Sequence, residues 1–148
     1  YDRVHHAVAA VHAGWRSTVL RIPEAVLQAM AGAYGTRPQD VEAAIGPGIS
    51  LEAFEVGNEV YEAFRTVGFP MGEMARRYPA AGDGSGRMEK WHLDLWQANR
   101  GLLEGCGVPS TRIHLAGVCT YLHSERFFSA RRLGIRSGRI LNGIFLTD

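Results

Sequence analysis

The sequence has few of the features that mark disulfide-stabilised, membrane or nucleic-acid-binding proteins. Only Cys106 and Cys119 occur among 148 residues, which excludes a disulfide framework and favours a reducing, cytoplasmic location. No apolar run approaches the roughly 20 residues of a membrane-spanning helix, and no basic-then-apolar leader is visible. The net charge of +1 gives no reason to expect a nucleic acid or an anionic membrane as a partner.

What is present is typical of one globular domain. Apolar residues make up 46% and charged residues 21% of the chain, and 148 residues suffice to bury a core. Hydrophobic periodicity predicts helices and strands in alternation, which indicates an α/β or α+β fold. The predicted strands are Val4–Val11, Asp40–Gly46, Arg112–Val118 and Arg139–Leu146. The predicted helices are Ser17–Tyr34, Val56–Val67 and Leu93–Glu104, and Gly68–Arg87 is expected to be a long loop or lid.

His12 stands where the first predicted strand ends, in the stretch AVHAGWRST. A histidine beside a glycine at a strand end is well placed to face a cleft as a metal ligand or general base. A core histidine bonded to a backbone carbonyl is the simpler alternative. Arg16, four residues on, is expected either to bind an anion at a helix start or to be solvated.

The turn Gly46-Pro47-Gly48 separates a predicted strand from a predicted helix. Backbone N–H groups at such a turn can hold an anion, although the lysine and spacing of a P-loop are missing. A purely structural tight turn is the alternative interpretation.

The third stretch is CTYLHSERFFSARR, from Cys119 to Arg132. Cys119 and His123 are four residues apart, so on a helix they would share a face and could ligate a metal, whereas a buried inert cysteine is the default. Ser129, Arg131 and Arg132 together could bind a phosphate or carboxylate, since the guanidinium group suits both.

These stretches occur in the order AVHAGWRST, IGPGISLEAFEVGNEV, LDLWQAN, GVPSTRIHLAGVCTY and FFSARRLGIRSGR. That order resembles the YfiH-type laccase-domain family, whose members have been called multicopper polyphenol oxidases, purine nucleoside phosphorylases and peptidoglycan editing factors. The resemblance implies an α+β fold, a four-layer αββα sandwich with mixed β-sheets. Residues 1–148 would form the C-terminal portion of one such domain, because motifs of the upstream Gln-Val-His and Ala-Asp-Cys types do not occur here.

The resemblance also implies one zinc ion held by two histidines and a cysteine, of which His12 corresponds to the last ligand. It places Cys119 and Arg131 among the catalytic residues, and Arg16, Ser129 and Arg132 among those that bind substrate. Ser17, Ala130 and Leu133 depart from the usual Gly, Tyr and acidic residue of the family, which puts substrate contacts near Arg131 in question.

The function implied is zinc-dependent phosphorolysis of adenosine, inosine and methylthioadenosine by a monomer, with adenosine deamination as a side activity. Alternatives are a zinc hydrolase that edits peptidoglycan precursors, a copper-dependent phenol oxidase, and a metal-free fragment without activity. Copper is disfavoured because the chain lacks the His-X-His pattern and the histidine clusters of multicopper oxidases.

Overall fold

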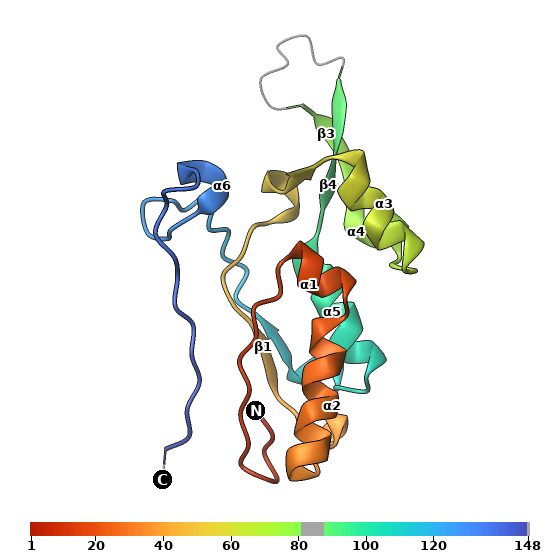
Figure 1. Ribbon diagram of the computed structural model, residues 1–148, viewed down its shortest axis with the longest axis vertical. Helices are drawn as coiled ribbons and strands as arrows, with labels where there is room; N and C mark the ends of the chain where they lie inside the picture. Colours follow the sequence, from red (N-terminus) through yellow and green to blue (C-terminus); the bar gives the residue numbers. More distant parts are fainter. Residues whose placement is uncertain (81–87, 148) are drawn as a thin grey trace. The chain divides into compact units, whose positions relative to one another are not determined.

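The computed structural model describes residues 1–80 and 88–147, which form short helices and two small β-sheets (Figure 1). In chain order the elements are α1 (Trp15–Val19), α2 (Ile22–Tyr34), η1 (Pro38–Asp40), β1 (Ala43–Ile45), η2 (Leu51–Ala53), β2 (Glu55–Val56), α3 (Asn58–Thr66), α4 (Met71–Met74), β3 (Ala75–Pro79), β4 (Glu89–Leu93), α5 (Leu95–Gly105), η3 (Ser110–Arg112), β5 (Ile113–Leu115) and α6 (Ala130–Leu133). The predicted α+β class with mixed sheets is confirmed, because β1 pairs with β5 in parallel and β2, β4 and β3 form an antiparallel sheet.

The single helix predicted over Ser17–Tyr34 is two helices in the structure. The chain turns between α1 and α2 at Arg21, whose φ of 57° lies in the left-handed region. Pro23 lies in the first turn of α2, where its missing N–H leaves no helical hydrogen bond unmade. It therefore opens the helix rather than kinking it. Gly35 ends α2 with a φ of 74°, as the sequence predicts.

Two predicted strands are not strands in the structure. Residues 8–14 and 134–147 have no regular secondary structure, and most of their side chains are exposed. The prediction that Val4–Val11 is a buried strand is wrong, and so is the strand predicted over Arg139–Leu146. Both segments carry the residues of buried strands, but apart from one bridge between Ala7 and Asp2 no segment within residues 1–80 and 88–147 pairs with them.

The loop predicted over Gly68–Arg87 is also wrong in its first half. Residues 71–79 form α4 and the strand β3, which pairs with β4 from Ala75 opposite Leu93 to Pro79 opposite Glu89. Two adjacent arginines, Arg76 and Arg77, hide the strand from a hydrophobicity pattern. The rest of the predicted loop, residues 81–87, lies outside the described residues.

The chain divides into two units, which are described separately. Unit 1 comprises Tyr1–Gly46, Asn99–Ala116 and Ile140–Asp148, and unit 2 comprises Pro47–Ala98 and Gly117–Arg139. In unit 1 a cluster of Leu27, Val41, Val108 and Ile113 packs helix α2 against β1 and β5. Ala43, Ile45, Leu103 and Cys106 pack against this cluster, so Cys106 is a packing residue.

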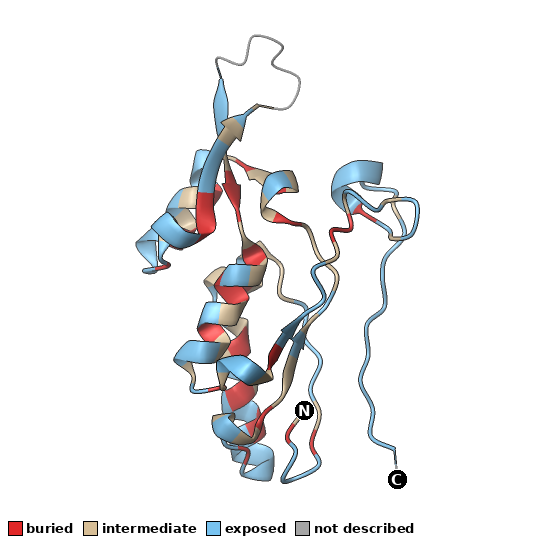
Figure 2. Cartoon of the chain, turned by 180° about the vertical axis from the view of Figure 1, so that it is seen from behind, coloured by how far each residue is buried: buried red, intermediate tan, exposed pale blue. Residues whose placement is uncertain are grey.

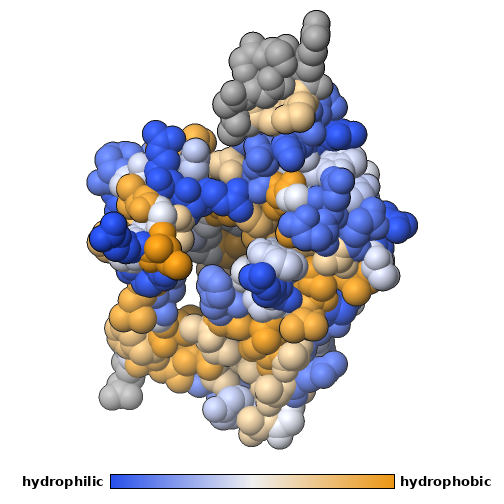
Figure 3. All heavy atoms as spheres, turned by 45° about the horizontal axis from the view of Figure 1, so that its top comes forward, coloured by the Kyte–Doolittle hydropathy of each residue, from blue (hydrophilic) through white to orange (hydrophobic). Residues whose placement is uncertain are grey.

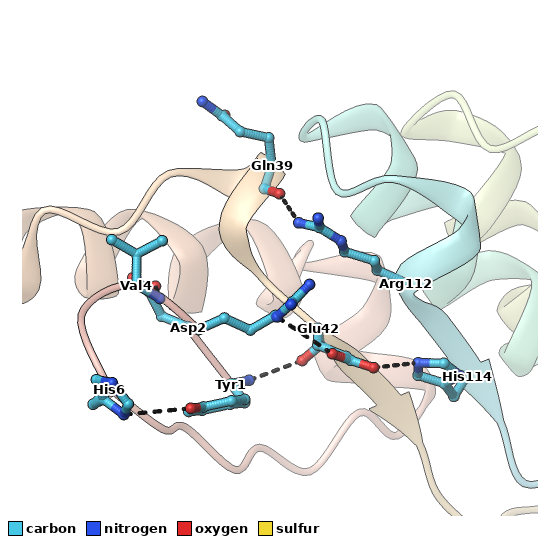
Figure 4. A network of polar contacts seen from close by, with 9 residues as sticks. Tyr1, Asp2, Val4, His6, Gln39, Glu42, Arg112 and His114 are labelled. Atoms are coloured by element: carbon cyan, nitrogen blue, oxygen red, sulfur yellow. Dashed lines mark hydrogen bonds and ion pairs between the residues drawn. The ribbon is translucent and has the colours of Figure 1, made fainter.

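Polar contacts tie the first residues of the chain to the same small sheet (Figure 4). His114 on β5 bonds to the Glu42 carboxylate at 2.8 Å, and Arg112 donates to the backbone carbonyl of Gln39. Asp2 is fully buried and accepts hydrogen bonds from the backbone N–H groups of Val4 and His5. These contacts fix how the first turn of the chain joins β1.

In unit 2, helix α3 packs against the antiparallel sheet. Phe64 is fully buried and lies edge-on to Phe69, with ring centroids 4.9 Å apart. Tyr61 stacks on Trp91 of β4 at 4.1 Å. Figure 2 shows buried residues, in red, on helices and strands, whereas residues 138–147 are exposed.

Candidate functional site

His12 lies at the end of the extended segment that leads into α1, and its side chain is exposed. Gly14, the residue before α1, is needed at its position because a Cβ there would lie 2.9 Å from His12 Nε2. A side chain at position 14 would thus displace the imidazole. The expectation that His12 lies at the end of a buried strand is wrong. His12 instead lies three residues before helix α1, which begins at Trp15.

Ser17 holds the backbone of this turn. Its hydroxyl lies 3.0 Å from the carbonyl oxygens of both His12 and Gly14, so it can donate to either. The sequence marks Ser17 only as a departure from the family's usual glycine. In the structure the extra hydroxyl links the His12 peptide to α1.

A buried pair fixes α1 in unit 1. Thr18 is fully buried, and the Asn99 side-chain nitrogen donates to its hydroxyl oxygen at 3.1 Å. Asn99 belongs to the LDLWQAN stretch, which the sequence analysis used for the resemblance without giving Asn99 a role. A sequence signal for Asn99 did exist, because it is a polar residue on the buried side of helix α5. The pair sets the position of the helix that follows His12.

Arg16 is exposed on α1, with its guanidinium 4.3 Å from the centre of the Trp15 ring. This contact leaves the N–H groups of the guanidinium free to bind an anion, because a cation–π contact uses the face of the group. Arg16 and His12 are four residues apart in the sequence and both belong to unit 1. Its assignment to substrate remains a prediction.

In unit 2, Cys119 is buried beside the turn that follows β1. Gly48 bridges to Cys119 in parallel, with its N–H bonded to Val118 O at 3.1 Å and its carbonyl accepting from Thr120 N at 2.8 Å. The Gly48 N–H is therefore engaged by the protein, which favours a structural turn over an anion site. The Cys119 Sγ accepts a hydrogen bond from Ser50 N at 3.4 Å.

The environment of Cys119 favours the thiolate. Burial raises the pKa of the thiol, but the polar groups of Ser50 and the backbone of Leu122 and Tyr121 outweigh it, so that the pKa is lowered. Cys106 differs, because burial and the nearby Glu24 raise the pKa of its thiol. A lowered thiol pKa is the usual property of a reactive cysteine.

Cys119 and His123 do not form a metal pair in the structure. His123 is exposed and lies 3.4 Å from the Glu125 carboxylate, whereas Cys119 is buried. Within residues 1–80 and 88–147, no three His, Cys, Asp or Glu side chains are grouped closely enough to hold a metal ion.

The arginines of α6 are held by neighbours in unit 2. Arg131 donates to the Glu55 carbonyl at 2.7 Å and lies 5.2 Å from the Phe54 ring centre, and Arg132 lies 5.1 Å from the Tyr121 ring centre. Ser129 is buried and caps α6, its hydroxyl accepting from the Arg132 N–H at 3.4 Å. Capping occupies the Ser129 hydroxyl, while both guanidinium groups keep exposed donors.

Sequence reasoning gave His92 no role, yet it lies in an unusual setting. The imidazole is buried, and Nδ1 lies 3.0 Å from the Leu51 carbonyl, an acceptor, so Nδ1 carries the proton. Nε2 is then an acceptor, and it is buried with no partner within the described residues, as are Ser50 Oγ and Trp96 Nε1. Of these residues Ser50 contacts Cys119, through its backbone N–H, and only the fold brings residues 50 and 119 together.

Comparison with known proteins decides the family. A family model described as multi-copper polyphenol oxidoreductase laccase matches residues 1–147. The chain belongs to this laccase family. Purine nucleoside phosphorylase from Bacteroides thetaiotaomicron is 52% identical over 146 residues, which cover 99% of this chain and 52% of the relative. Adenosine deaminase RL5, from an unknown prokaryotic organism, is 44% identical over 138 residues, covering 93% of this chain and 50% of the relative.

The laccase-family fold is also found in solved structures. That of the Bacillus licheniformis hypothetical protein YfiH superposes with a TM-score of 0.76 at 29% identity, covering 89% of this chain and 47% of that chain. The resemblance seen in the sequence is thereby confirmed. The chain spans about half the length of the curated relatives it matches.

The donor set found here does not by itself fit a catalytic zinc ion. Such an ion takes three protein ligands and one open position. His12 is the one ligand that the sequence assigns, and the described residues group no second and third donor with it. No helix among the described residues combines the length and apolar character needed to cross a membrane.

Proposed function

We propose that this chain forms part of an enzyme that cleaves purine nucleosides with phosphate. The observation that carries the proposal is the 52% identity to a purine nucleoside phosphorylase over 146 of its 148 residues. Other relatives with the same activity in their names, from Deinococcus radiodurans and Bacillus subtilis, are 38% and 31% identical.

The proposed reaction replaces one bond by another at the sugar. A phosphate oxygen forms a bond to the anomeric carbon, while the bond from that carbon to the purine nitrogen breaks and the base leaves with the electron pair and takes up a proton. The phosphate brings negative charge, which guanidinium groups are suited to hold in two parallel hydrogen bonds. We assign this role to Arg131 and Arg132 of unit 2, and we propose Arg16 of unit 1 as a substrate-binding residue in its own right. The exposed guanidinium groups of all three support the assignment.

His12 is proposed as one zinc ligand, and the described residues group no further donors with it. Its exposed imidazole, set at the end of an extended segment beside Gly14, is open to a metal ion. We propose Cys119 as a catalytic residue because its Sγ is held by the Ser50 N–H at 3.4 Å beside the Gly48 turn, as the family resemblance leads us to expect. Substrates would be adenosine, inosine and methylthioadenosine.

Deamination of adenosine is a second candidate, supported by the 44% identity to adenosine deaminase RL5. This reaction replaces the purine amino group by oxygen from water and releases ammonia, so it needs no phosphate. The two activities are therefore separated by their products and by their dependence on phosphate.

The test is chromatography of adenosine after incubation with the protein, loaded with zinc, in the presence and absence of phosphate. Adenine that appears only with phosphate supports phosphorolysis, and inosine that appears in both conditions supports deamination. Adenosine that stays unchanged in both, from a protein shown to contain zinc, contradicts both candidates.

Substitutions at His12 and at His123 test whether His12 is a metal ligand. His12→Ala should abolish the activity and zinc binding, whereas His123→Ala, which changes another exposed histidine, should leave both unchanged. Arg131→Lys keeps the charge but loses the planar pair of donors, so it should raise the KM for phosphate.

A further inference from the structure

A cavity of about 270 Å³ opens on the surface of unit 1, among residues that the proposed function does not use. Its walls are formed by Arg3, Val4, Asp40 and Arg112. The volume lies just below the range of roughly 300–1,000 Å³ that is common for pockets of drug-sized ligands, so the cavity has room for a small molecule. Figure 3 shows hydrophilic residues, in blue, over much of the face in view, so exposed charge alone does not single out a site. The charged groups of this cavity are distinguished by how they are paired.

The fold sets the backbone positions of the cavity walls. Ala43 of β1 lies opposite Ile113 of β5, so the chain segments that lead into these two strands run side by side. Arg112, directly before β5, donates a hydrogen bond to the backbone carbonyl of Gln39 (Figure 4). The backbone N–H of Arg3 donates to the carbonyl of residue 40 at 3.2 Å. Backbone pairing therefore holds the walls in place without any ligand.

Both acidic side chains of this region are held by other groups. The Asp40 Oδ2 lies 2.7 Å from the Arg37 Nε, and the Glu42 Oε1 lies 2.8 Å from the His114 Nε2. Arg3 reaches the second oxygen of Glu42 only at 4.0 Å, and its side chain is half exposed. The carboxylate in the cavity wall is thus already neutralised by Arg37, which leaves the positive charge of Arg3 weakly compensated.

The second guanidinium group, that of Arg112, is not compensated by a carboxylate within residues 1–80 and 88–147. Arg112 is half-buried, and its bond to the Gln39 carbonyl is a bond to an uncharged group. A partly buried charge without a counter-ion is unfavourable, and Arg3 brings a like charge to the same cavity. A bound anion removes both costs, because a guanidinium group presents a planar set of donors that suits phosphate oxygens.

We propose that this cavity binds the phosphate group of a small phosphorylated molecule, with Arg3 and Arg112 as the donors to its oxygens. A phosphate monoester carries about −1.5 to −2 charges at pH 7, which suits two guanidinium groups better than the single charge of a carboxylate does. Val4, which is 56% exposed, offers apolar surface to the rest of the molecule. Inorganic phosphate presents the same oxygens, so the experiment includes both sources of the group.

The experiment is isothermal titration calorimetry with ribose 5-phosphate, inorganic phosphate and acetate as probes. The protein carries Arg131→Gln and Arg132→Gln, which remove the phosphate donors of the proposed function, so a failure of that function leaves the result unaffected. We expect both phosphate probes to bind, with the tighter one identifying the source, and acetate at the same concentration to give no signal. Hydrogen exchange should show protection by the phosphate probes at residues 2–5 and 110–113.

Further variants test whether the two arginines make the contact. Arg112→Gln and Arg3→Gln should each weaken the binding of ribose 5-phosphate by about tenfold or more, because a hydrogen bond to a charged group is lost. Arg100→Gln is the matched control, since Arg100 is an exposed arginine of unit 1 that pairs with Glu104 at 3.0 Å. It should leave the binding unchanged. Asp40→Asn removes a negative charge from the cavity wall and should tighten the binding several-fold.

Three results would overturn the proposal. The first is the absence of binding for both phosphate probes, and the second is binding that neither Arg3→Gln nor Arg112→Gln weakens more than Arg100→Gln does. The third is acetate that binds as tightly as ribose 5-phosphate, which makes the cavity an unselective anion site. Should Arg112→Gln unfold through loss of its contact with Gln39, Arg3→Gln still decides, because the Arg3 side chain is exposed and circular dichroism checks its fold.

Discussion

The replacement of Thr18 by valine tests whether a buried hydrogen bond holds α1 in place. Thr18 is fully buried, its hydroxyl oxygen accepts from the Asn99 side chain at 3.1 Å, and it lies 3.4 Å from the Ala13 carbonyl. Valine has nearly the same shape, so packing changes little. The Asn99 amide loses a partner in a place that water does not reach.

The magnitude follows from the cost of leaving a buried polar group without its partner, about 1–3 kcal/mol. For a domain of this size each kcal/mol lowers the midpoint of thermal unfolding by about 2–4 °C. Thr18→Val should therefore unfold roughly 2–12 °C below the parent chain. Thr18→Ser, which keeps the hydroxyl, should retain most of the hydrogen-bond contribution.

The assay is thermal unfolding followed by circular dichroism, with Thr111→Val as the control because Thr111 is exposed. The double variant Thr18→Val with Asn99→Leu completes a double-mutant cycle, in which the two single losses should add to more than the double loss because both remove the same hydrogen bond. A Thr18→Val protein within about 0.5 kcal/mol of the parent, the range of ordinary surface substitutions, would refute the reasoning.

The remaining predictions concern ionisable groups. His12→Ala should leave the unfolding temperature unchanged, because the side chain is exposed, and a marked loss on thermal unfolding would make His12 a packing residue. The variants Cys106→Ser and Cys119→Ser each leave one thiol, whose ionisation can be followed by absorbance near 240 nm. Cys119 should form its thiolate at a lower pH than Cys106, because the pKa of Cys119 is lowered and that of Cys106 is raised. The reverse order would contradict the environments assigned to the two thiols. Burial raises the pKa of Asp2, but contacts with Thr36, His5 and Val4 outweigh it and hold the pKa well below 3.8. The ionised Asp2 therefore stabilises the fold above its unfolded-state pKa, and this stabilisation is lost as the pH falls through the lower folded-state pKa. The free energy of unfolding, measured as the pH is lowered, should fall less in Asp2→Asn than in the parent chain.

The sequence predicted helix α2 and helix α5 well, because neighbouring residues determine where these helices form. The Pro23 and Gly35 signals mark the two ends of α2, and the apolar spacing of α5 places Leu102 in the core. The break between α1 and α2 was missed because left-handed Arg21 carries no glycine or asparagine signal. Strand β3 was missed because Arg76 and Arg77 are exposed and its pairing with β4 is decided by tertiary contacts.

The two strands that the structure lacks are a different kind of error. Residues 8–13 and 140–147 have the composition of buried strands, but a strand needs a neighbour as well as a sequence. The motifs single out His12 and Cys119 as candidate site residues, and their roles stay predictions. The contacts of Ser17, Asn99 and His92 depend on which groups lie opposite them in the fold, and no spacing in the sequence reveals that.

The central proposal is that this chain forms part of an enzyme that cleaves purine nucleosides with phosphate. The most direct measurement is the formation of adenine from adenosine by a zinc-loaded protein that contains this chain, with phosphate present or omitted. We predict that adenine forms only with phosphate and that it does not form in His12→Ala. Adenosine left intact by the folded, zinc-containing protein would contradict the proposal.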